Sequence, residues 1–186
     1  MVYLVIALKS EAQAFVEKYK LIKTKCGSFT LFYNENIVLI ISGMGVQNAK
    51  NATICLLESF NIGDSDILVN IGICGASKNY RIGEIVQIGS LWYKDKFYTI
   101  DATSPNELTC VDEEITKSGY EMVDMESFGF FEATKLVQNR HIYKVVSDHF
   151  EPQNITKDAV KKLLSAVIDE VLKKRLKNEK SSCNRC

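Results

Sequence analysis

Short runs of apolar residues alternate with longer amphipathic stretches along this chain. The short runs are rich in β-branched and aromatic residues, which is typical of strands. They predict strands at residues 2–8, 29–33, 36–42, 66–71, 84–90 and 142–147. Asn34 and Glu35 separate the second run from the third, and this pair predicts a β-hairpin.

The longer stretches have the apolar period of helices that cover a core. They predict helices at residues 10–20, 46–61, 124–139 and 156–177. The sequence KKRLK near the end of the last stretch suits the C-terminal end of a helix. Continuously apolar strands that alternate with helices indicate a sheet covered on both faces. The pattern therefore predicts an α/β sandwich.

The chain has 186 residues, enough for one substantial core. No repeat, low-complexity block or linker rich in proline and glycine divides it. We therefore expect a single domain over residues 1–178 and a polar C-terminal tail over residues 179–186. The tail contains Cys183 and Cys186, a Cys-x-x-Cys pair that suggests metal binding or redox cycling, but a disordered end is the simpler interpretation.

Charge and cysteine content narrow the partners and the compartment. Lysine plus arginine equals aspartate plus glutamate, at 23 each, so no basic surface for nucleic acid or an anionic membrane is expected. No apolar run reaches the roughly 18 to 20 residues that cross a bilayer, and the apolar start has no basic leader. Four further cysteines lack the spacing of a disulfide framework: Cys26, Cys55, Cys74 and Cys110. We expect reduced thiols, a cytoplasmic protein and a small-molecule ligand.

Three acidic residues stand where predicted strands give way to loops or helices: Glu11, Glu126 and Asp148. Each alone has a structural explanation, because acids are favoured in the first turn of a helix and at turns; Asp124 is expected to cap its helix. Strand ends of an α/β sheet meet at one edge, however, so together the three predict a cleft lined by carboxylates. One carboxylate can deprotonate a water, a second can donate a proton to a leaving base, and a third can hold sugar hydroxyls. Such a set suits cleavage of a sugar–base bond, with Met125 as an apolar floor for the sugar.

Two glycine-rich turns also follow strands, SGMGVQNAKNA from Ser42 and NIGICGAS from Asn70. Glycines at such places let the backbone approach a ligand closely, although either turn alone is more simply structural. Neither matches a dinucleotide fingerprint. His141 and His149 lack the spaced partners of a zinc site, so neither a metal nor a cofactor is expected.

Taken in order, these segments resemble the purine nucleoside phosphorylase superfamily, and within it the methylthioadenosine/S-adenosylhomocysteine nucleosidases. VIALKSEAQAF resembles the first strand and catalytic glutamate of that family, and ISGMGVQNA and LVNIGICGAS resemble its two glycine turns. RIGEIVQI, MVDMES and VVSDHF complete the series. The resemblance implies a three-layer α/β/α sandwich on a central mixed sheet, and a homodimer.

The resemblance also implies roles for particular residues. Glu11 would orient and deprotonate the attacking water, and Asp148 would protonate the purine at N7. Met125 would pack under the ribose, and Glu126 would bind its 2′ and 3′ hydroxyls. The other motif positions of the substrate site are Gly43, Gly72, Ile73 and Ser147. The implied activity is hydrolysis of the N-glycosidic bond of a purine nucleoside such as methylthioadenosine or S-adenosylhomocysteine, with release of the base.

Departures from the family pattern leave two alternatives open. The family is expected to be some tens of residues longer, with the shortfall between KFYTID and LTCVDEEI, and Ile73 replaces its usual serine. These differences fit a degenerate protein that binds a purine nucleoside without turnover. The other alternative is a phosphate-dependent phosphorylase with Lys9 as a phosphate ligand. Water is favoured over phosphate because no arginine stands at the phosphate-binding motif positions; the arginines are Arg81, Arg140, Arg175 and Arg185.

Overall fold

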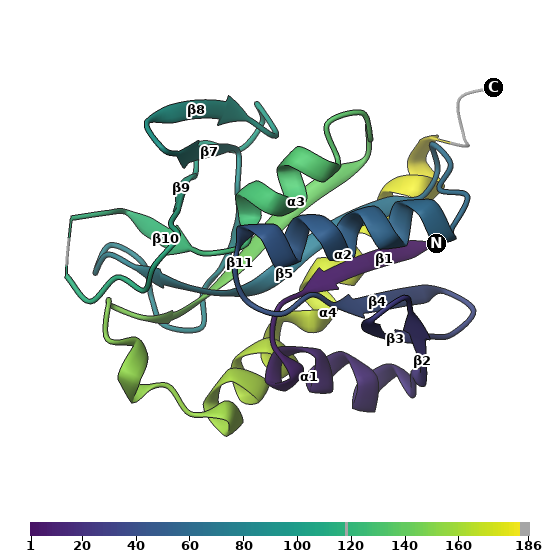
Figure 1. Ribbon diagram of the computed structural model, residues 1–186, viewed down its shortest axis with the longest axis horizontal. Helices are drawn as coiled ribbons and strands as arrows, with labels where there is room; N and C mark the ends of the chain where they lie inside the picture. The colour runs from purple at the N-terminus through teal and green to yellow at the C-terminus, as the bar shows by residue number, and fades with distance from the viewer. Residues whose placement is uncertain (118, 183–186) are drawn as a thin grey trace.

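A central β-sheet carries helices on both faces in the computed structural model of the chain (Figure 1). The structure describes residues 1–117 and 119–182, with side chains described as far as Asp169. The strands are β1 (Val2–Ile6), β2 (Ile22–Cys26), β3 (Phe29–Tyr33), β4 (Ile37–Ile41), β5 (Ile67–Ala76), β6 (Ile85–Gln87), β7 (Ser90–Tyr93), β8 (Lys96–Thr99), β9 (Glu107–Cys110), β10 (Met122–Asp124) and β11 (Arg140–Asp148). The helices are α1 (Lys9–Tyr19), α2 (Val46–Ser59), α3 (Ser127–Ala133) and α4 (Lys157–Ser182), with a short 3-10 turn at Pro152–Asn154.

The sheet is mixed, with the strand order β2-β3-β4-β1-β5-β10-β9-β7-β8, and β11 pairs with β5 and β6. β1 runs parallel to β4 and β5, and β11 runs parallel to β5, whereas β10 runs antiparallel to β5. β3 and β4 form the predicted hairpin, in which the Asn34 side-chain oxygen accepts the N–H groups of Asn36 and Ile37. This asparagine side chain closes the turn in the way expected of Asx turns.

Alternate residues of the central strands serve two separate cores. In β1, Tyr3 and Val5 face the core that α2 and α3 cover, and Leu4 and Ile6 face the core that α1 and α4 cover. Figure 1 shows the same division, with α2 and α3 on one side of the sheet and α1 and α4 on the other. The three-layer α/β/α sandwich on a mixed sheet is therefore confirmed. No helix in the described part of the chain is long and apolar enough to span a membrane.

The helix predicted over residues 124–139 is much shorter in the structure. Met122–Asp124 pair with β5 and β9 and so form strand β10 instead. At the other end, Arg140 Nη1 donates to the carbonyl oxygens of Thr134, Lys135 and Val137. This guanidinium satisfies carbonyl groups that a continuing helix would have used, so α3 ends at Ala133.

Other differences from the prediction have local causes. The run 84–90 divides into β6 and β7 at Gly89, where an added Cβ would overlap the Ser104 carbonyl oxygen. β2 is exposed and polar over most of its length, so it has no apolar run. β8, β9 and β10 are three or four residues long, too short to show a period. α4 continues to Ser182, so the expected tail is helical at residues 179–182; Cys183 and Cys186 lie outside the described residues.

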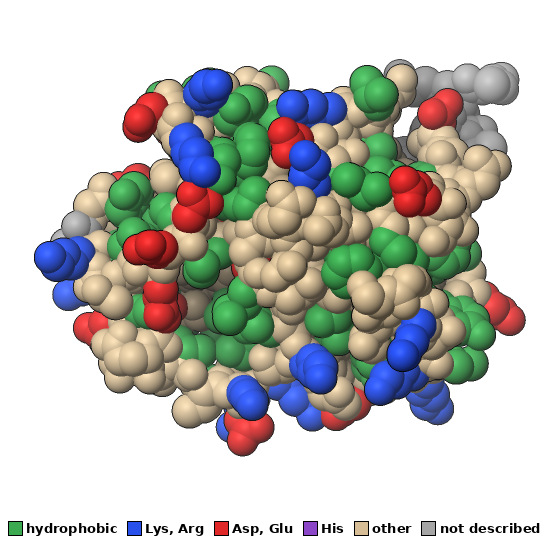
Figure 2. All heavy atoms as spheres, viewed as in Figure 1, with side chains coloured by type: hydrophobic (Ala, Val, Ile, Leu, Met, Phe, Trp, Pro, Cys, Tyr) green, Lys and Arg blue, Asp and Glu red, His purple; other side chains and the backbone are tan. Residues whose placement is uncertain are grey.

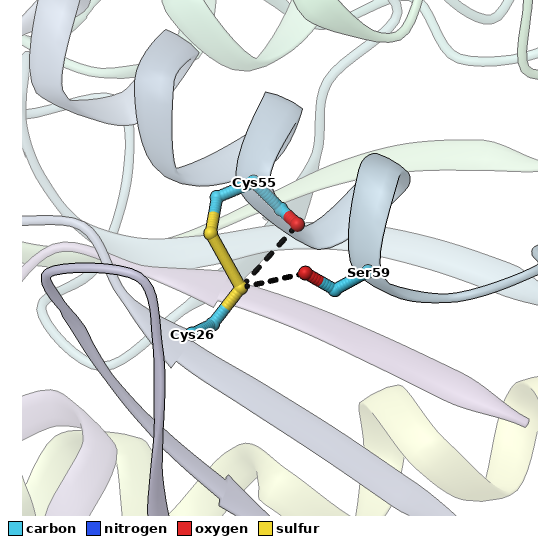
Figure 3. The surroundings of a disulfide bond; sticks show 3 residues. All are labelled: Cys26, Cys55 and Ser59. Atoms are coloured by element: carbon cyan, nitrogen blue, oxygen red, sulfur yellow. Dashed lines mark hydrogen bonds between the residues drawn. A yellow bond between two sulfur atoms is a disulfide. The ribbon is translucent and has the colours of Figure 1, made fainter.

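Cys26 at the end of β2 and Cys55 in α2 form a disulfide (Figure 3). Their Cα atoms are 6.5 Å apart, and Ser59 Oγ lies 3.2 Å from Cys26 Sγ. The bond ties the β2–β3 hairpin to the helix that covers it. The prediction of reduced thiols is wrong for these two cysteines because residues 29 positions apart are brought together by the fold. Cys74 and Cys110 are free and buried.

Candidate active site

The second half of β5 forms the floor of a pocket of about 130 Å³. β1 pairs with β5 only as far as Asn70, so the residues beyond it extend past the end of β1. Ile73, Cys74 and Gly75 line the pocket from this extension. Other strand ends close its sides, with Met125 and Glu126 after β10 and Ser147 and Asp148 at the end of β11. Of the three acids that the sequence predicted to line one cleft, Glu126 and Asp148 line this pocket.

Glu11 borders the pocket at Ile73, behind the residues that line it. Its side chain is in the first turn of α1 and is only 2% exposed. Oε1 accepts the Ile73 N–H at 2.8 Å, and Oε2 accepts the Leu8 N–H at 2.8 Å. An added Cβ on Gly72 would lie 2.8 Å from Glu11 Oε1, so the glycine leaves the room that the carboxylate needs. Burial raises the pKa of Glu11 although both backbone N–H groups lower it, and a raised pKa suits proton exchange with a bound water.

Glu126 is held by the turn that precedes α2. Its Oε1 accepts the Gly45 N–H at 2.9 Å. The contact depends on close packing of α3 on α2, because an added Cβ on Gly129 would overlap the Val46 carbonyl oxygen. Burial, followed by the charge of Asp124, raises the pKa of Glu126 to about 7. Met125, half-buried, lies beside it in the pocket wall.

Asp148 is fixed at both carboxylate oxygens. Oδ1 accepts the Glu151 N–H at 2.9 Å. Ser147 Oγ lies 2.6 Å from Asp148 Oδ2 and 3.0 Å from the Cys74 carbonyl oxygen, so its single proton goes to one of them at a time. The register between β11 and β5 shifts at this point, and such bulges redirect side chains next to functional sites.

The backbone just after Asp148 is strained. Phe150 has a φ of 66°, a left-handed conformation that bulky residues rarely adopt. Its ring is buried and lies 3.5 Å from where a Cβ of Gly75 would stand. The turn at Phe150 brings the Glu151 N–H to Asp148, so the strain is stored where the carboxylate is positioned.

Sequence reasoning missed Lys144, which lies in the middle of β11 with its side chain fully buried. Its Nζ lies 2.6 Å from Asp124 Oδ2 and 2.8 Å from Asn70 Oδ1. Asn70 in turn donates through Nδ2 to the Val5 carbonyl oxygen at 3.1 Å. The signal was present, because a lysine inside an apolar strand that is covered on both faces needs a buried partner.

Asp124 has two functions in this network. Its Oδ2 accepts the Ser127 N–H at 3.0 Å and the Ser127 hydroxyl at 2.6 Å, so it caps α3 as predicted. The same oxygen accepts from Lys144. Asp124 Oδ1 is buried and has no hydrogen-bond partner among the described residues. The side chain also lines the pocket beside Glu126.

The site holds more acid than base. Lys144 is the cation whose charge acts on Asp124, Glu126 and Glu11. Burial lowers the pKa of Lys144, but these carboxylates raise it by more, so the ammonium stays charged. Burial is the main reason why Glu11 and Glu126 have raised pKa values, and the charge of Asp124 adds to the effect. One positive charge does not balance these acids in a desolvated place. The site therefore favours a ligand that becomes positively charged.

The two glycine turns do not bring Gly43 and Gly72, which were predicted as substrate-site residues, into the pocket wall. Gly43 has a φ of 84° and donates its N–H to the Ala7 carbonyl oxygen, and it does not line the pocket. Gly45, two residues later, supplies the N–H that contacts Glu126. Gly72 lies against Glu11, and Ile73 supplies both an N–H to Glu11 and a side chain to the pocket wall.

Part of the pocket wall was not predicted. It comes from the loop after β9, from β10 and from the 3-10 turn, through Val111, Glu114, Ile115, Val123 and Pro152. No sequence pattern marks loop residues such as these as pocket residues. Among the described residues, no lysine or arginine lines the pocket, and no group of three His, Cys, Asp or Glu side chains is placed to hold a metal.

Solved structures with the same fold include several nucleosidases. The 5′-methylthioadenosine/S-adenosylhomocysteine nucleosidase of Neisseria meningitidis, in complex with methylthio-immucillin-A, has a TM-score of 0.76 at 18% identity over 93% of this chain and 98% of that chain. The futalosine hydrolase of Helicobacter pylori has a TM-score of 0.74 at 13% identity, over 91% and 97% of the two chains. The Arabidopsis thaliana 5′-methylthioadenosine nucleosidase has a TM-score of 0.72 at 17% identity, over 91% and 95%.

Sequence comparison assigns the family. Comparison with curated proteins gives no match. The family model described as the phosphorylase superfamily matches residues 2–117, which is more than half of the chain and includes Glu11 and both glycine turns. This match and the shared fold agree, and the chain belongs to the phosphorylase superfamily.

Proposed function

We propose that this protein is a purine nucleosidase that hydrolyses the N-glycosidic bond of a purine nucleoside, including 5′-substituted ones such as methylthioadenosine or S-adenosylhomocysteine. The observation that carries the proposal is the convergence of Glu11, Glu126 and Asp148 on the extension of β5. The names of the similar structures describe nucleosidases and a hydrolase, which supports hydrolysis as the reaction.

Glu11 and Asp148 contact β5 at different points along the strand. Glu11 accepts the N–H of Ile73, and Asp148 Oδ1 lies 3.4 Å from where a Cβ of Gly75 would stand. These contact points are two residues apart, about 7 Å along a strand. Glycosidases that attack with water place their two carboxyl groups roughly 6.5 to 9.5 Å apart. The proposed reaction requires a separation of this size, with the acid on one side of the sugar and the base on the other.

In the proposed reaction the bond between C1′ and N9 breaks as a water oxygen bonds to C1′. Glu11 takes a proton from the water as general base. Asp148, in its protonated form, donates its own proton to N7 of the departing base as general acid. The products are the free base and the free sugar, so atoms and charge balance. The sugar ring becomes positively charged as the bond breaks, and the excess of carboxylates around Lys144 stabilises that charge.

Glu126 and Met125 bind the sugar in this proposal. An ionised carboxylate accepts hydrogen bonds from two neighbouring hydroxyl groups, which fits the 2′ and 3′ positions of ribose. Gly45 holds one oxygen of Glu126 and so fixes the direction in which the carboxylate points. Met125 gives the ring an apolar surface beside the carboxylate.

Water is favoured over phosphate as the nucleophile. A phosphate dianion needs charged donors, and the described pocket wall has neither lysine nor arginine. The nearby ammonium of Lys144 is already bound to Asp124 and Asn70. Phosphate would also add negative charge to a site in which carboxylates already outnumber cations.

The experiment is to incubate the protein with adenosine, inosine, guanosine, methylthioadenosine and S-adenosylhomocysteine, with and without phosphate. Free base and free sugar are expected in both conditions, and Glu11→Gln should abolish them. Sugar 1-phosphate that forms only with phosphate would make the protein a phosphorylase. Thermal stabilisation by a nucleoside without release of base would instead make it a non-catalytic binder.

A homodimer and a cytoplasmic location form part of the same proposal. The dimer follows from the resemblance, and light scattering of the purified protein tests it. The Cys26–Cys55 disulfide is the feature that opposes a reducing compartment, because such bonds are rare there. Thiol titration of protein isolated under alkylating conditions shows whether Cys26 and Cys55 are free thiols or a disulfide.

A further inference from the structure

The Cys26–Cys55 disulfide closes a loop of the chain that contains one contact of the candidate site. This loop runs from the end of β2 through β3, β4 and the first glycine turn into α2. Gly45 lies inside it, and the Gly45 N–H is the donor that holds Glu126 Oε1. A cross-link removes conformational freedom from the loop that it closes. The disulfide therefore limits how far Gly45 can move away from Glu126.

Helix α2 connects the disulfide to Gly45. Val46 begins the helix, and Cys55 lies about 14 Å further along its axis. Between them, Ala49 and Ala52 are buried against the core. Such small side chains offer little resistance when a helix slides on its neighbours, and sliding of packed helices is a common form of conformational change. The covalent bond at Cys55 therefore restrains a movement that packing alone resists weakly.

The opposite end of α2 is sensitive to such a movement. Glu126 precedes α3, and α3 packs on α2 so closely that a Cβ on Gly129 would overlap the Val46 carbonyl oxygen. The distance from Gly45 N to Glu126 Oε1 is 2.9 Å. Hydrogen bonds of this kind are about 2.7 to 3.2 Å long, so a movement of α2 by a fraction of an ångström weakens the contact.

The surroundings of the two cysteines suit both the disulfide and the two thiols (Figure 3). Ser59 Oγ lies 3.2 Å from Cys26 Sγ, and because a sulfur in a disulfide has no proton, the hydroxyl is then the donor. The Cys55 carbonyl oxygen lies 3.3 Å from the same sulfur. This oxygen can accept a hydrogen bond from Cys26 only when Cys26 is a thiol. Cys26 therefore has a hydrogen-bond partner in each state.

A reductant can reach the disulfide from the surface. Cys55 is half-buried, and Gly27 and Ser59 beside it are exposed. A Cβ on Gly27 would stand 3.5 Å from Cys55 Sγ, so the glycine leaves that sulfur without a covering side chain from this position. Figure 2 shows positively charged side chains on the surface over β2, which contains the exposed Lys23 and Lys25. Positive charge attracts a thiolate, which is the attacking form of a thiol.

We propose that Cys26 and Cys55 form a reversible thiol–disulfide switch that sets the position of the Glu126 carboxylate through helix α2. The reductant is a dithiol. One of its thiolates attacks Cys55 Sγ and breaks the S–S bond, and Cys26 departs as a thiolate that accepts from the Ser59 hydroxyl before it takes up a proton. The second thiolate of the reductant then displaces Cys55. Two electrons and two protons pass to the cysteine pair, and the dithiol becomes a disulfide.

The first experiment tests whether the exchange is reversible in the folded protein. The native protein is treated with dithiothreitol and then with oxidised glutathione. Mass spectrometry of alkylated peptides should show the pair opening and closing while circular dichroism shows that the fold is retained. A bond that opens only in urea, or a fold that is lost when the bond opens, would make the disulfide a structural cross-link and overturn the proposal.

Amide hydrogen exchange measures the coupling to the site without any substrate. In the reduced protein, and in the double variant Cys26→Ser, Cys55→Ser, the amides of residues 43–49 should exchange about tenfold faster than in the oxidised protein. The β7–β8 hairpin lies at the opposite edge of the sheet from β2 and outside the disulfide loop, so its exchange rates should stay the same. Equal acceleration in both segments, or none in residues 43–49, would contradict the proposed coupling.

Catalysis gives a third readout, whose interpretation rests on the proposed nucleosidase function. Reduction should raise KM for methylthioadenosine by about fivefold or more, because Glu126 is proposed to bind the ribose, and reoxidation should restore it. The double variant should keep the higher KM with either reagent. An equal KM in both states of the native protein would overturn the switch while the nucleosidase stands. If no nucleoside releases base, the nucleosidase proposal fails, and hydrogen exchange alone decides whether the switch exists.

Discussion

Lys144 Nζ lies 2.6 Å from Asp124 Oδ2, and both side chains are 1% exposed. The pair joins strand β11, which carries Asp148, to strand β10, which leads to Glu126. The buried ammonium also holds Asn70 on β5, so one side chain links the three strands that form the pocket. Removing one member of a buried pair leaves the other charge without compensation.

Lys144→Met should therefore destabilise the protein strongly. The expected loss in the free energy of unfolding is about 3 to 5 kcal/mol, because Asp124 remains buried and capping α3. Urea titration followed by circular dichroism measures it. Lys161→Met is the control, since Lys161 is more exposed and pairs with Glu17 at the surface, and it should cost less than about 1 kcal/mol. Equal losses in the two variants would contradict this account of the buried pair.

Glu126 should make stability depend on pH. Its pKa is about 7 in the folded protein and near the ordinary value of 4.5 when unfolded. A carboxyl group with a raised folded pKa binds its proton more tightly in the folded state, so its contribution is complete below the unfolded pKa and is lost as pH rises toward 7. Stability should therefore fall between about pH 4.5 and 7, by at most about 3 kcal/mol from this group.

The comparison that isolates this effect is Glu126→Gln. Its urea midpoint should change less than that of the native protein between about pH 4.5 and 7, with the difference confined to that window. Base release should fall by about a hundredfold or more in the same variant. The amide replaces one of the two carboxylate oxygens that accept from the ribose hydroxyls by a donor. A variant that is much less stable at every pH yet keeps its turnover would return Glu126 to a purely structural role.

The sequence predicts the central part of the fold because buried parallel strands are continuous apolar runs. β1, β4, β5 and β11 have this property, and the meeting of Glu11 and Asp148 follows from where β1 and β11 end. Glu126 follows β10, which the sequence did not predict as a strand. β2 and β8–β10 escape prediction because they are short or exposed, so packing against neighbours decides their conformation.

The unpredicted parts of the site depend on contacts between distant segments. The partner of Lys144 is 20 residues away in sequence, and its position depends on how β10 is placed beside β5. Glu114 reaches the pocket through a loop whose path has no periodic signal. The glycine turn places Gly45 rather than Gly43 against Glu126, because the close approach of α2 and α3 sets that contact.

Gly129→Ala tests whether the packing of α3 on α2 controls the position of the Glu126 carboxylate. The added methyl group would overlap the Val46 carbonyl oxygen, so α3 must move away from α2 and the Gly45 contact with Glu126 must lengthen. We expect a loss of about 2 to 4 kcal/mol in unfolding free energy and a higher KM for nucleosides. Gly63→Ala is the matched control, since no atom lies within 4 Å of its added Cβ, and it should change stability by less than about 0.5 kcal/mol. If both variants show the same change in unfolding free energy and KM, the close packing of α3 on α2 does not control the position of Glu126.

Glu11→Gln tests the base that activates water. The amide nearly matches the carboxylate in shape, and its oxygen can still accept the Ile73 N–H. Its NH2 group would face the Leu8 N–H, which the carboxylate accepts in the native protein, so some loss of stability is expected and is measured separately from turnover. The amide cannot take a proton from water, and kcat should fall by about 10² to 10⁴. The measurement is base release under saturating nucleoside, with unfolding by urea as the check on the fold. Glu17→Gln on the exposed side of the same helix is the control and should keep full turnover. Retention of turnover by Glu11→Gln would assign proton removal to another group and leave Glu11 as a support for the turn at Ile73.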